Sequence, residues 1–399
     1  MKKAIIAFIE RLWRRSFPAR SVSFDDQVKH LKSFIQYDIT KTNSPSTKPE
    51  LKKLVIYFII PDFVPGAGGH MTIFRIASYL ERFGHKVHFL IQNPSVHHSG
   101  EDALQTINTH FQSISGSVTL FNDKIPDVSG DALIATDRFT CYPARAMTGF
   151  HETFYFVQDF EPQFYPMGTE YLLTEATYRF GFSCLCAGEW LQTIMQDKYG
   201  AWSRSWPLAC DTDVYFEDAK TAREEHTIAV YARFVTPRRA VELVYLALEN
   251  LALRGMKFKV EFFGWPMGDI QPSFEFVDHG VLSSNELSDL YRRATVGVVF
   301  SATNHSLANK EMMACGLPVV DLDEENVRTI FPNDVMAFAK PSPLEIADTL
   351  ERLLVSPDER LELSNKASEY VAAFSWEKSA RVVEDAIKER LVDLTKEAS

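Results

Sequence analysis

The sequence has no apolar run long enough to cross a membrane and no excess of basic residues. No uninterrupted apolar stretch approaches the roughly 20 residues that a membrane-spanning helix needs. Lys and Arg number 42 against 53 Asp and Glu, which gives a formal net charge of −11. Because a general nucleic-acid binder needs a basic surface for the phosphates, this balance argues against one. We expect a soluble or membrane-peripheral protein.

Cysteine is scarce, and its spacing fits neither a zinc site nor a disulfide framework. The five cysteines are Cys141, Cys184, Cys186, Cys210 and Cys315, without a Cys-x-x-Cys pair or paired histidines. An odd number without these spacings predicts a reducing compartment and no structural zinc. Cys184 and Cys186 point to one face of a predicted strand, where we expect small core residues.

The length of 399 residues, 46% of them hydrophobic, exceeds one ordinary core and predicts two domains. We expect helices and a linker over residues 1–50, a first domain over 51–215, a second domain over 216–375, and a terminal helix over 376–399 that crosses back onto the first domain.

The N-terminal segment reads as a basic amphipathic helix. Residues 2–17 place apolar side chains on one side and basic ones on the other, and residues 1–20 carry six Lys or Arg against Glu10 alone. Each basic residue near an anionic leaflet contributes about 1 kcal/mol. The helix is therefore predicted to bind a membrane surface or, equally, to pack on the protein's own surface or on a partner chain. A secretory signal is disfavoured. A second helix over 25–37 and a linker over 40–49 follow.

Strand-like apolar runs alternate with helical segments along the rest of the chain, which predicts an α/β protein with parallel sheets. The predicted strands are residues 54–60, 86–91, 117–121, 131–135, 153–157, 182–187, 227–232, 257–263, 296–300, 319–321 and 335–338.

One stretch, residues 301–321, carries the chemistry most clearly. It follows an apolar strand at the sheet edge where ligands collect. Ser306 is placed to cap a helix that runs to Ala314, whose N-terminus would suit a phosphate. The spacing alone also fits an ordinary β-α-β unit in which Glu311 is a surface residue.

The run EMMACGLPVV at 311–320 resembles the donor-site signature of family 4 of the glycosyltransferases. The resemblance covers most of residues 54–395 and implies a GT-B fold of two facing Rossmann-like domains and a reaction that retains anomeric configuration. The family signature has two glutamates eight positions apart, and the second holds the ribose. Glu311 matches the second, whereas Thr303 stands in place of the first, which usually contacts the donor sugar or its diphosphate end.

The resemblance also implies roles in the second domain. The family grips the diphosphate with an arginine and a lysine about five residues later; Arg233 matches the first, and Arg238, or Arg239, replaces the lysine. The fork of arginine suits bidentate phosphate contacts. The alternative is a solvated basic turn. The backbone near Val281 and Leu282 corresponds to the nucleobase pocket.

In the first domain, a glycine-rich loop at 61–70 precedes a helix. Met71 stands where a dinucleotide fingerprint needs its third glycine, which argues against nicotinamide binding. In the resembled family this loop faces the donor phosphates and sugar, a role we assign to Gly68 and Gly69; the alternative is a tight turn.

The run VQDFEP at 157–162 resembles bacterial rhamnosyltransferases of cell-surface glycans, including S-layer glycans. This implies dTDP-L-rhamnose as donor, with UDP- and GDP-sugars as alternatives. Asp159 is predicted to contact sugar hydroxyls or activate the acceptor; the alternative is a loop-capping carboxylate.

Taken together, the predicted catalytic residues are Arg233, Arg238, Glu311 and Asp159. The residues predicted to bind the donor nucleotide and diphosphate are Gly68, Gly69, Arg233, Arg238, Arg239, Val281, Leu282, Asn304, His305, Ser306, Leu307 and Glu311. Those predicted to bind the acceptor or sugar are His70, Gln158, Asp159 and Thr303.

The predicted function is a metal-independent retaining glycosyltransferase without a cofactor, in which Asp211 and Asp213 bind no metal. Its expected partners are a nucleotide sugar, a lipid-linked or oligosaccharide acceptor and an anionic membrane surface met through residues 2–17, but not nucleic acid. The expected location is the cytoplasm, at the inner face of the cell membrane. The rival interpretation, motivated by Thr303, is a non-catalytic nucleotide- or glycan-binding assembly protein.

Overall fold

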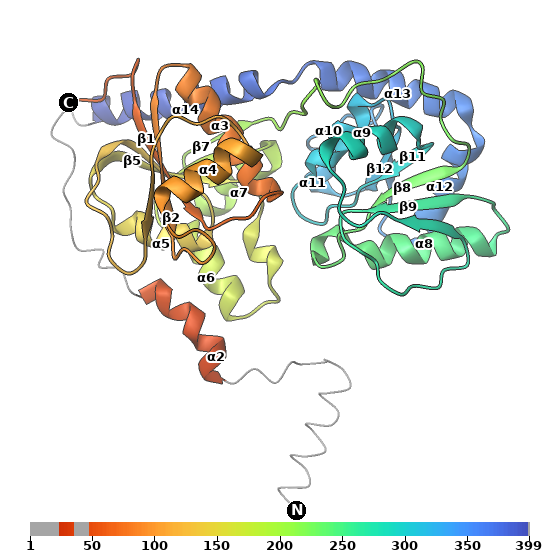
Figure 1. Ribbon diagram of the computed structural model, residues 1–399, viewed down its shortest axis with the longest axis horizontal. Helices are drawn as coiled ribbons and strands as arrows, with labels where there is room; N and C mark the ends of the chain where they lie inside the picture. The colour runs from red at the N-terminus through yellow and green to blue at the C-terminus, as the bar shows by residue number, and fades with distance from the viewer. Residues whose placement is uncertain (1–23, 36–47, 398–399) are drawn as a thin grey trace, which may run out of the picture.

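The computed structural model describes residues 24–35 and 48–397 and places two α/β domains side by side (Figure 1). The first sheet contains β1 (Val55–Pro61), β2 (Lys86–Gln92), β3 (Val118–Phe121), β4 (Gly130–Ala135), β5 (Phe150–Val157), β6 (Ser183–Ala187) and β7 (Ser203–Trp206). The second contains β8 (Thr227–Tyr231), β9 (Lys259–Phe263), β10 (Glu275–Asp278), β11 (Val296–Val298), β12 (Val319–Leu322) and β13 (Ala337–Ala339).

Helices connect the strands in both domains. Those of the first are α3 (Gly68–Arg82), α4 (Gly100–His110), α5 (Arg138–Ala146), η2 (Glu161–Phe164), α6 (Thr169–Thr177) and α7 (Glu189–Tyr199). Those of the second are η3 (Pro237–Arg239), α8 (Val241–Leu253), α9 (Ser284–Arg293), α10 (Leu307–Ala314), α11 (Glu325–Arg328), α12 (Pro343–Val355) and α13 (Pro357–Ala372), followed by α14 (Trp376–Glu397).

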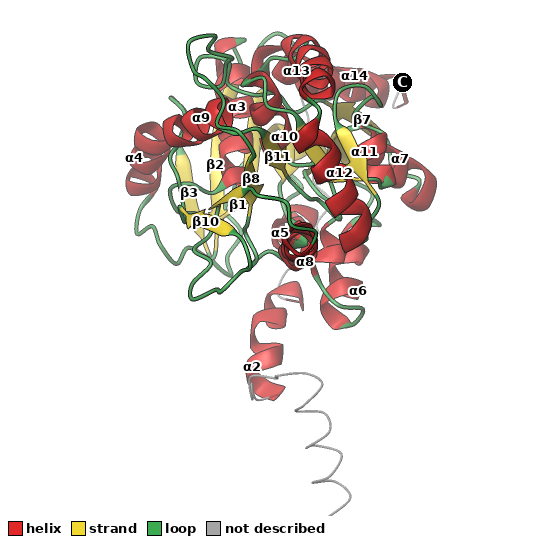
Figure 2. Ribbon diagram, turned by 90° about the vertical axis from the view of Figure 1, so that its right-hand side faces the viewer, coloured by secondary structure: helices red, strands yellow, loops and turns green. Residues whose placement is uncertain are grey.

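Both sheets are wholly parallel and reverse their strand order once. The orders are β3-β2-β1-β4-β5-β6-β7 and β10-β9-β8-β11-β12-β13. The order reverses between β1 and β4 in one sheet and between β8 and β11 in the other. In open α/β sheets ligands bind outside the carboxyl ends of the strands at such points. In the view turned by 90°, the strands lie in the middle of the molecule with helices on either side of them (Figure 2).

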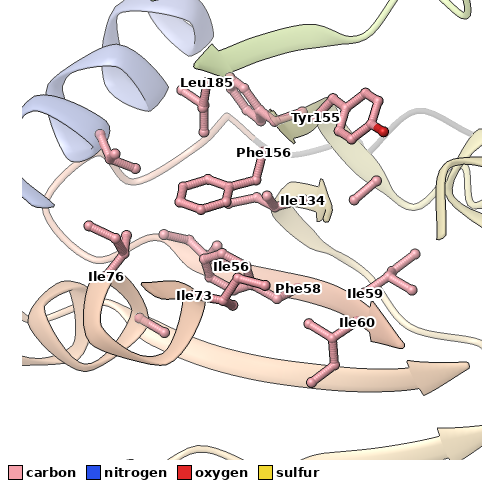
Figure 3. Packing of buried hydrophobic residues seen from close by; sticks show 14 of the residues in the cluster. Ile56, Phe58, Ile59, Ile60, Ile73, Ile76, Ile134, Tyr155, Phe156 and Leu185 are labelled. Carbon is pink, nitrogen blue, oxygen red and sulfur yellow. The ribbon is translucent and has the colours of Figure 1, made fainter. Parts of the chain in front are cut away.

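The core of the first domain explains why its strands read as continuous apolar runs. Parallel strands that are covered on both faces need apolar side chains in both directions. Figure 3 shows Ile56 and Phe58 of β1 close to Ile73 and Ile76 of α3, with Phe156 of β5 nearby. All five are at most 2% exposed.

Helix α14 belongs to the core of the first domain although it follows the second in sequence. Figure 1 shows it along one side of the first domain, and it packs against α3. Ala380, Val383 and Ile387 are fully buried in the same apolar cluster as β1 and β5. Glu384 accepts a 2.8 Å hydrogen bond from the buried imidazole of His85. The chain therefore crosses between the domains twice.

The predicted α/β class with two parallel sheets is confirmed, with local differences. Sequence analysis missed the edge strands β7 and β10, which are short and lack a long apolar run. The helix predicted over 25–37 is an α-helix only over Phe24–Lys29 and continues as a 3-10 helix over His30–Ile35. The amphipathic segment 2–17 lies outside the described residues. Among the described residues, none of the helices combines the length and apolarity that a bilayer crossing requires.

Candidate functional site

A cleft with a volume of about 760 Å³ lies between the domains. Its walls come from the loops at the carboxyl ends of the strands of both sheets, including the segment after β1 and the segment after β8. This position follows from the topology, because both strand-order reversals open onto it. Of the predicted residues, those that line it are Gly68, Gly69, His70, Gln158, Asp159, Arg233, Arg238, Arg239, Val281, Leu282, His305, Ser306, Leu307 and Glu311.

Helix α10 points its N-terminus at the cleft, as the capping pattern predicts. Ser306 has extended backbone angles, and its hydroxyl accepts a hydrogen bond from the amide of Ala308 at 3.3 Å. The residues around this cap line the cleft. Free amides at a helix N-terminus and the helix dipole favour a bound anion.

Glu311 lies on the cleft side of α10. Burial raises the pKa of its carboxyl to about 7, an effect that the nearby Asp211 reinforces and Arg75 opposes. The carboxyl is therefore a group whose ionisation a ligand can change near neutral pH.

Three arginines approach the cleft from the loop after β8, in different environments. Arg233 is exposed to the cleft. Arg239 is enclosed, donates to the Ser301 hydroxyl at 2.9 Å and lies 5.3 Å from the centre of the Tyr231 ring. Burial lowers its pKa. Arg238 is 27% exposed and pairs with a carboxylate of the other domain.

A buried polar network supports the loop before α10. The Asp321 carboxylate accepts hydrogen bonds from the Ser301 amide at 3.2 Å and from the Asn309 side chain at 2.7 Å. Asn326 donates to the backbone oxygens of Ser301 and Thr303. Burial raises the pKa of Asp321 to about 7, opposed by these bonds and by the charge of Arg239. The network holds the loop in one conformation.

The predicted nucleobase wall is apolar and shaped by a glycine. Val281, 71% exposed, and Leu282 line the cleft together with the ring of Phe263. Gly264 follows β9 with φ +107°, and a Cβ there would lie 2.6 Å from the ring of Tyr231. Only glycine lets the backbone approach that ring so closely.

The first-domain wall is built on the glycine-rich loop. Gly68 and Gly69 begin α3, and a Cβ on Gly69 would touch the Gln158 amide at 3.6 Å. The Nε2 atom of His70 is 3.1 Å from the backbone oxygen of Pro61. Burial lowers the pKa of His70, which favours its neutral form at neutral pH.

Two predicted residues, Asn304 and Thr303, are buried and do not line the cleft, and Asn304 lies in the seam between the domains. Asn304 is 2% exposed, and its amide nitrogen donates to the backbone oxygens of Gln158 at 2.9 Å and Ala187 at 2.8 Å. Its side-chain oxygen therefore accepts from Nδ1 of His305, at 3.1 Å. Burial lowers the pKa of His305 to about 3, so its imidazole is neutral. Asn304 joins the two domains.

Sequence analysis missed an acidic group on the first-domain wall. Glu161, in η2, accepts a 2.9 Å hydrogen bond from the amide of Arg138. Burial raises its pKa to about 8, and the carboxylate of Asp137 contributes. Both carboxyls line the cleft. Glu161 lies within the run that resembles rhamnosyltransferases, but its burial depends on helices elsewhere in the chain.

No group of three or more His, Cys, Asp or Glu residues suited to a metal occurs within residues 24–35 and 48–397. The Asp211 carboxylate lies 3.6 Å from the guanidinium of Arg75 and also accepts from the amide of Asp213. The five cysteines are buried free thiols.

Comparison with solved structures identifies the architecture. The chain superposes on Alr3699/HepE from Anabaena, in complex with UDP-glucose, with a TM-score of 0.63 at 13% identity, covering 85% of this chain and 100% of that one. It superposes on WaaG, a glycosyltransferase involved in lipopolysaccharide biosynthesis, with a TM-score of 0.59 at 14% identity, covering 83% and 99%. This chain has the GT-B fold. At these identities the likeness establishes the fold alone.

Sequence comparison adds a family match within this GT-B chain. Residues 238–385 match a family described as glycosyl transferase-like. The O-antigen biosynthesis protein RfbC of Myxococcus xanthus is 28% identical over 228 residues, 56% of this chain and 18% of that protein. A D-inositol 3-phosphate glycosyltransferase of Frankia alni is 38% identical over 102 residues, a quarter of each chain. The chain thus spans a quarter or less of the length of these curated relatives.

Proposed function

We propose that this GT-B protein is a glycosyltransferase that moves a sugar from a nucleoside-diphosphate donor to a cell-surface glycan. One observation carries the proposal: Arg233, Arg238, Glu311 and the N-terminus of α10 converge on a single interdomain cleft. The glycosyl transferase-like match over residues 238–385 and the similarity to an O-antigen biosynthesis protein support it.

The second domain would bind the donor. The carboxylate of Glu311 would accept from the ribose hydroxyls, and Val281 and Leu282 would flank the base. Arg233 and Arg238 would meet the diphosphate together with the free amides at the start of α10, near Ser306. Charge-assisted hydrogen bonds of this kind contribute roughly 1.5–3 kcal/mol each.

The same groups would promote transfer. Cleavage of the bond between the sugar and the diphosphate places negative charge on the leaving group. Fixed positive charge and aligned amides stabilise that charge without reorganising, which is commonly the largest catalytic contribution. No covalent nucleophile is needed in this scheme, in which the anomeric configuration is retained and no metal holds the diphosphate.

The first domain would receive the acceptor. Its wall of Gly68, Gly69, His70 and Gln158 faces the donor groups across the cleft. We propose dTDP-L-rhamnose as donor because of the VQDFEP run, with UDP- and GDP-sugars as alternatives. UDP is among the nucleotides to test because Alr3699/HepE, which has a similar fold, was solved in complex with UDP-glucose. A lipid-linked or oligosaccharide acceptor at the inner face of the cell membrane completes the proposal.

Calorimetric titration with dTDP, UDP and GDP tests the donor site without knowledge of the acceptor. We expect one nucleotide to bind preferentially and Arg233→Ala to weaken it. The control is Arg352→Ala, because Arg352 is half exposed on α12 and pairs with Glu359 outside the cleft. If none of the three nucleotides binds the wild-type protein, the proposal is wrong.

Turnover separates the enzyme from the binding-protein alternative that Thr303 suggests. We expect release of nucleoside diphosphate from dTDP-rhamnose or UDP-glucose in the presence of bacterial glycan acceptors, and its loss in a folded Glu311→Ala variant. Tight nucleotide binding without turnover across donor and acceptor panels would favour the non-catalytic alternative.

A further inference from the structure

We propose that Asp159 and Phe164 are positioning residues that orient Arg238 toward the donor diphosphate, an inference that rests on the proposed function. Arg238 belongs to the second domain, whereas both partners belong to the first. The Nε atom of Arg238 lies 3.1 Å from Oδ2 of Asp159. The guanidinium carbon lies 4.3 Å from the centre of the Phe164 ring. The Nε edge of the guanidinium therefore lies in ion-pair contact with the other domain, without a hydrogen bond, and one face lies against an aromatic ring of that domain.

The two terminal nitrogens of Arg238 are left for a ligand. They make no hydrogen bond with another described residue, and the side chain lines the cleft. The backbone of Arg238 is also fixed, because its carbonyl accepts from the amide of Ala302 at 2.9 Å. A guanidinium presents its donors in a rigid fork, so an ion pair at the Nε edge and an aromatic ring against one face restrict where the remaining donors point. Such preorganisation lowers the entropy lost when an anion binds.

The carboxylate that holds Arg238 is itself immobilised. Its Oδ1 atom accepts from the amides of Phe160 and Asn304, both at 2.9 Å. Only Oδ2 remains to face Arg238. A carboxylate beside a diphosphate site would ordinarily repel the ligand, but pairing with Arg238 offsets its charge. With its oxygens engaged in this way, Asp159 is better suited to organise the anion site than to remove a proton from the acceptor.

The contact also depends on how the two domains sit. Asn304 bridges the seam in two ways. Its side-chain nitrogen donates to the backbone oxygens of Gln158 and Ala187, and its backbone amide donates to the Asp159 carboxylate. The Leu307 side chain packs against the apolar core of the first domain. Arg238 is consequently held in this orientation only while the seam is formed, and opening of the cleft would release it.

The test compares a nucleoside diphosphate with its nucleoside. We would measure the dissociation constants of UDP and uridine, dTDP and thymidine, and GDP and guanosine for the wild type, Asp159→Asn and Phe164→Leu, and analyse the tightest pair. Each variant is expected to weaken the diphosphate about five- to tenfold while the nucleoside is unchanged. A purely structural loss would weaken both ligands alike and would overturn the inference.

A double-mutant comparison isolates Arg238. In an Arg238→Ala background, Asp159→Asn and Phe164→Leu should cause no further loss of diphosphate affinity. An equal loss in that background, or tighter diphosphate binding by Asp159→Asn alone, would contradict a positioning role and leave Asp159 as a repelling charge. If the wild type binds no nucleoside diphosphate, both the proposed function and this inference are wrong. If the wild type binds one but the variants do not behave as described, only this inference is wrong.

Discussion

The Nζ atom of Lys310, on α10, donates a 2.7 Å hydrogen bond to the backbone oxygen of Leu208, in the segment that leaves the first domain. It also lies 3.4 Å from the centre of the Phe374 ring, in the segment that returns to that domain. Lys310 thus contacts both crossings between the domains, from the residue next to Glu311. Its side chain is among the most buried in the protein, with 1% of the residue exposed.

Lys310→Met should change how stability depends on pH. Burial lowers the pKa of Lys310 to about 7, below its unfolded value near 10.4. Between these values the unfolded chain binds a proton that the folded protein does not, so wild-type stability should rise with pH relative to the variant, by at most about 1.4 kcal/mol per pH unit. Urea unfolding at pH 7 to 10 measures this. Parallel curves for the two proteins would contradict it.

Nucleotide binding should become tighter as pH rises, through Glu311. Because burial raises its pKa to about 7, the carboxyl is protonated at pH 6 and ionised at pH 8. Ribose hydroxyls donate more strongly to the ionised form, so the affinity for the preferred nucleoside diphosphate should increase over this interval, by up to about tenfold per unit. Glu311→Gln should remove this component. Calorimetry in matched buffers measures the nucleotide affinity of the wild type and of Glu311→Gln at each pH. An identical pH dependence for the two proteins would exclude Glu311 as the group that binds the ribose.

Asp321→Ala should destabilise the second domain by about 1–3 kcal/mol for each buried donor left unpaired, because it removes the acceptor of the bonds from Ser301 and Asn309. Asp321→Asn should cost less. The Asn309 side-chain oxygen has no hydrogen-bond partner among the described residues, so its amide can turn and accept from the new side chain. Chemical unfolding of both variants tests the order, and equal losses would argue against this network.

Gly264→Ala should damage the cleft, whereas Gly255→Ala should not. Both glycines have positive φ, so each alanine is strained by about 1–3 kcal/mol. A Cβ on Gly264 would also collide with the Tyr231 ring, while one on Gly255 meets open space. Thermal unfolding should therefore show a larger loss for Gly264→Ala, together with weaker nucleotide binding. Comparable effects of the two substitutions would show that the backbone strain alone matters.

Much of the local structure could be predicted because local chemistry decides it. The strand predicted over 86–91 is β2, Lys86–Gln92, and Ser306 caps the helix that ends at Ala314, as expected. Capping depends on a side chain and an amide two or three residues away, and apolar periodicity depends on neighbouring turns. The short strand β10, of which three residues are exposed and the fourth is half-buried, carries little of that pattern and was missed.

The candidate site was only partly predictable, because its geometry depends on contacts between segments that are far apart in the sequence. The resemblance around Glu311 named residues that do line one cleft, but it could not reveal that Asn304 lies in the domain seam or that burial shifts the pKa of Glu161. Each of these depends on neighbours from distant segments. The proposed roles of the site residues remain predictions for the experiments described above.

The sequence by itself determined the α/β alternation, the apolar strands and the capped helix that carries Glu311, because backbone propensity and side-chain periodicity act over a few residues. The tertiary structure alone decided that Asp159 meets Arg238 and Asn304, the latter 145 positions away, and that Lys310 is buried against both crossings. Such contacts arise when two independently patterned sheets dock, and the strength of a charge or hydrogen bond there depends on the water that docking removes.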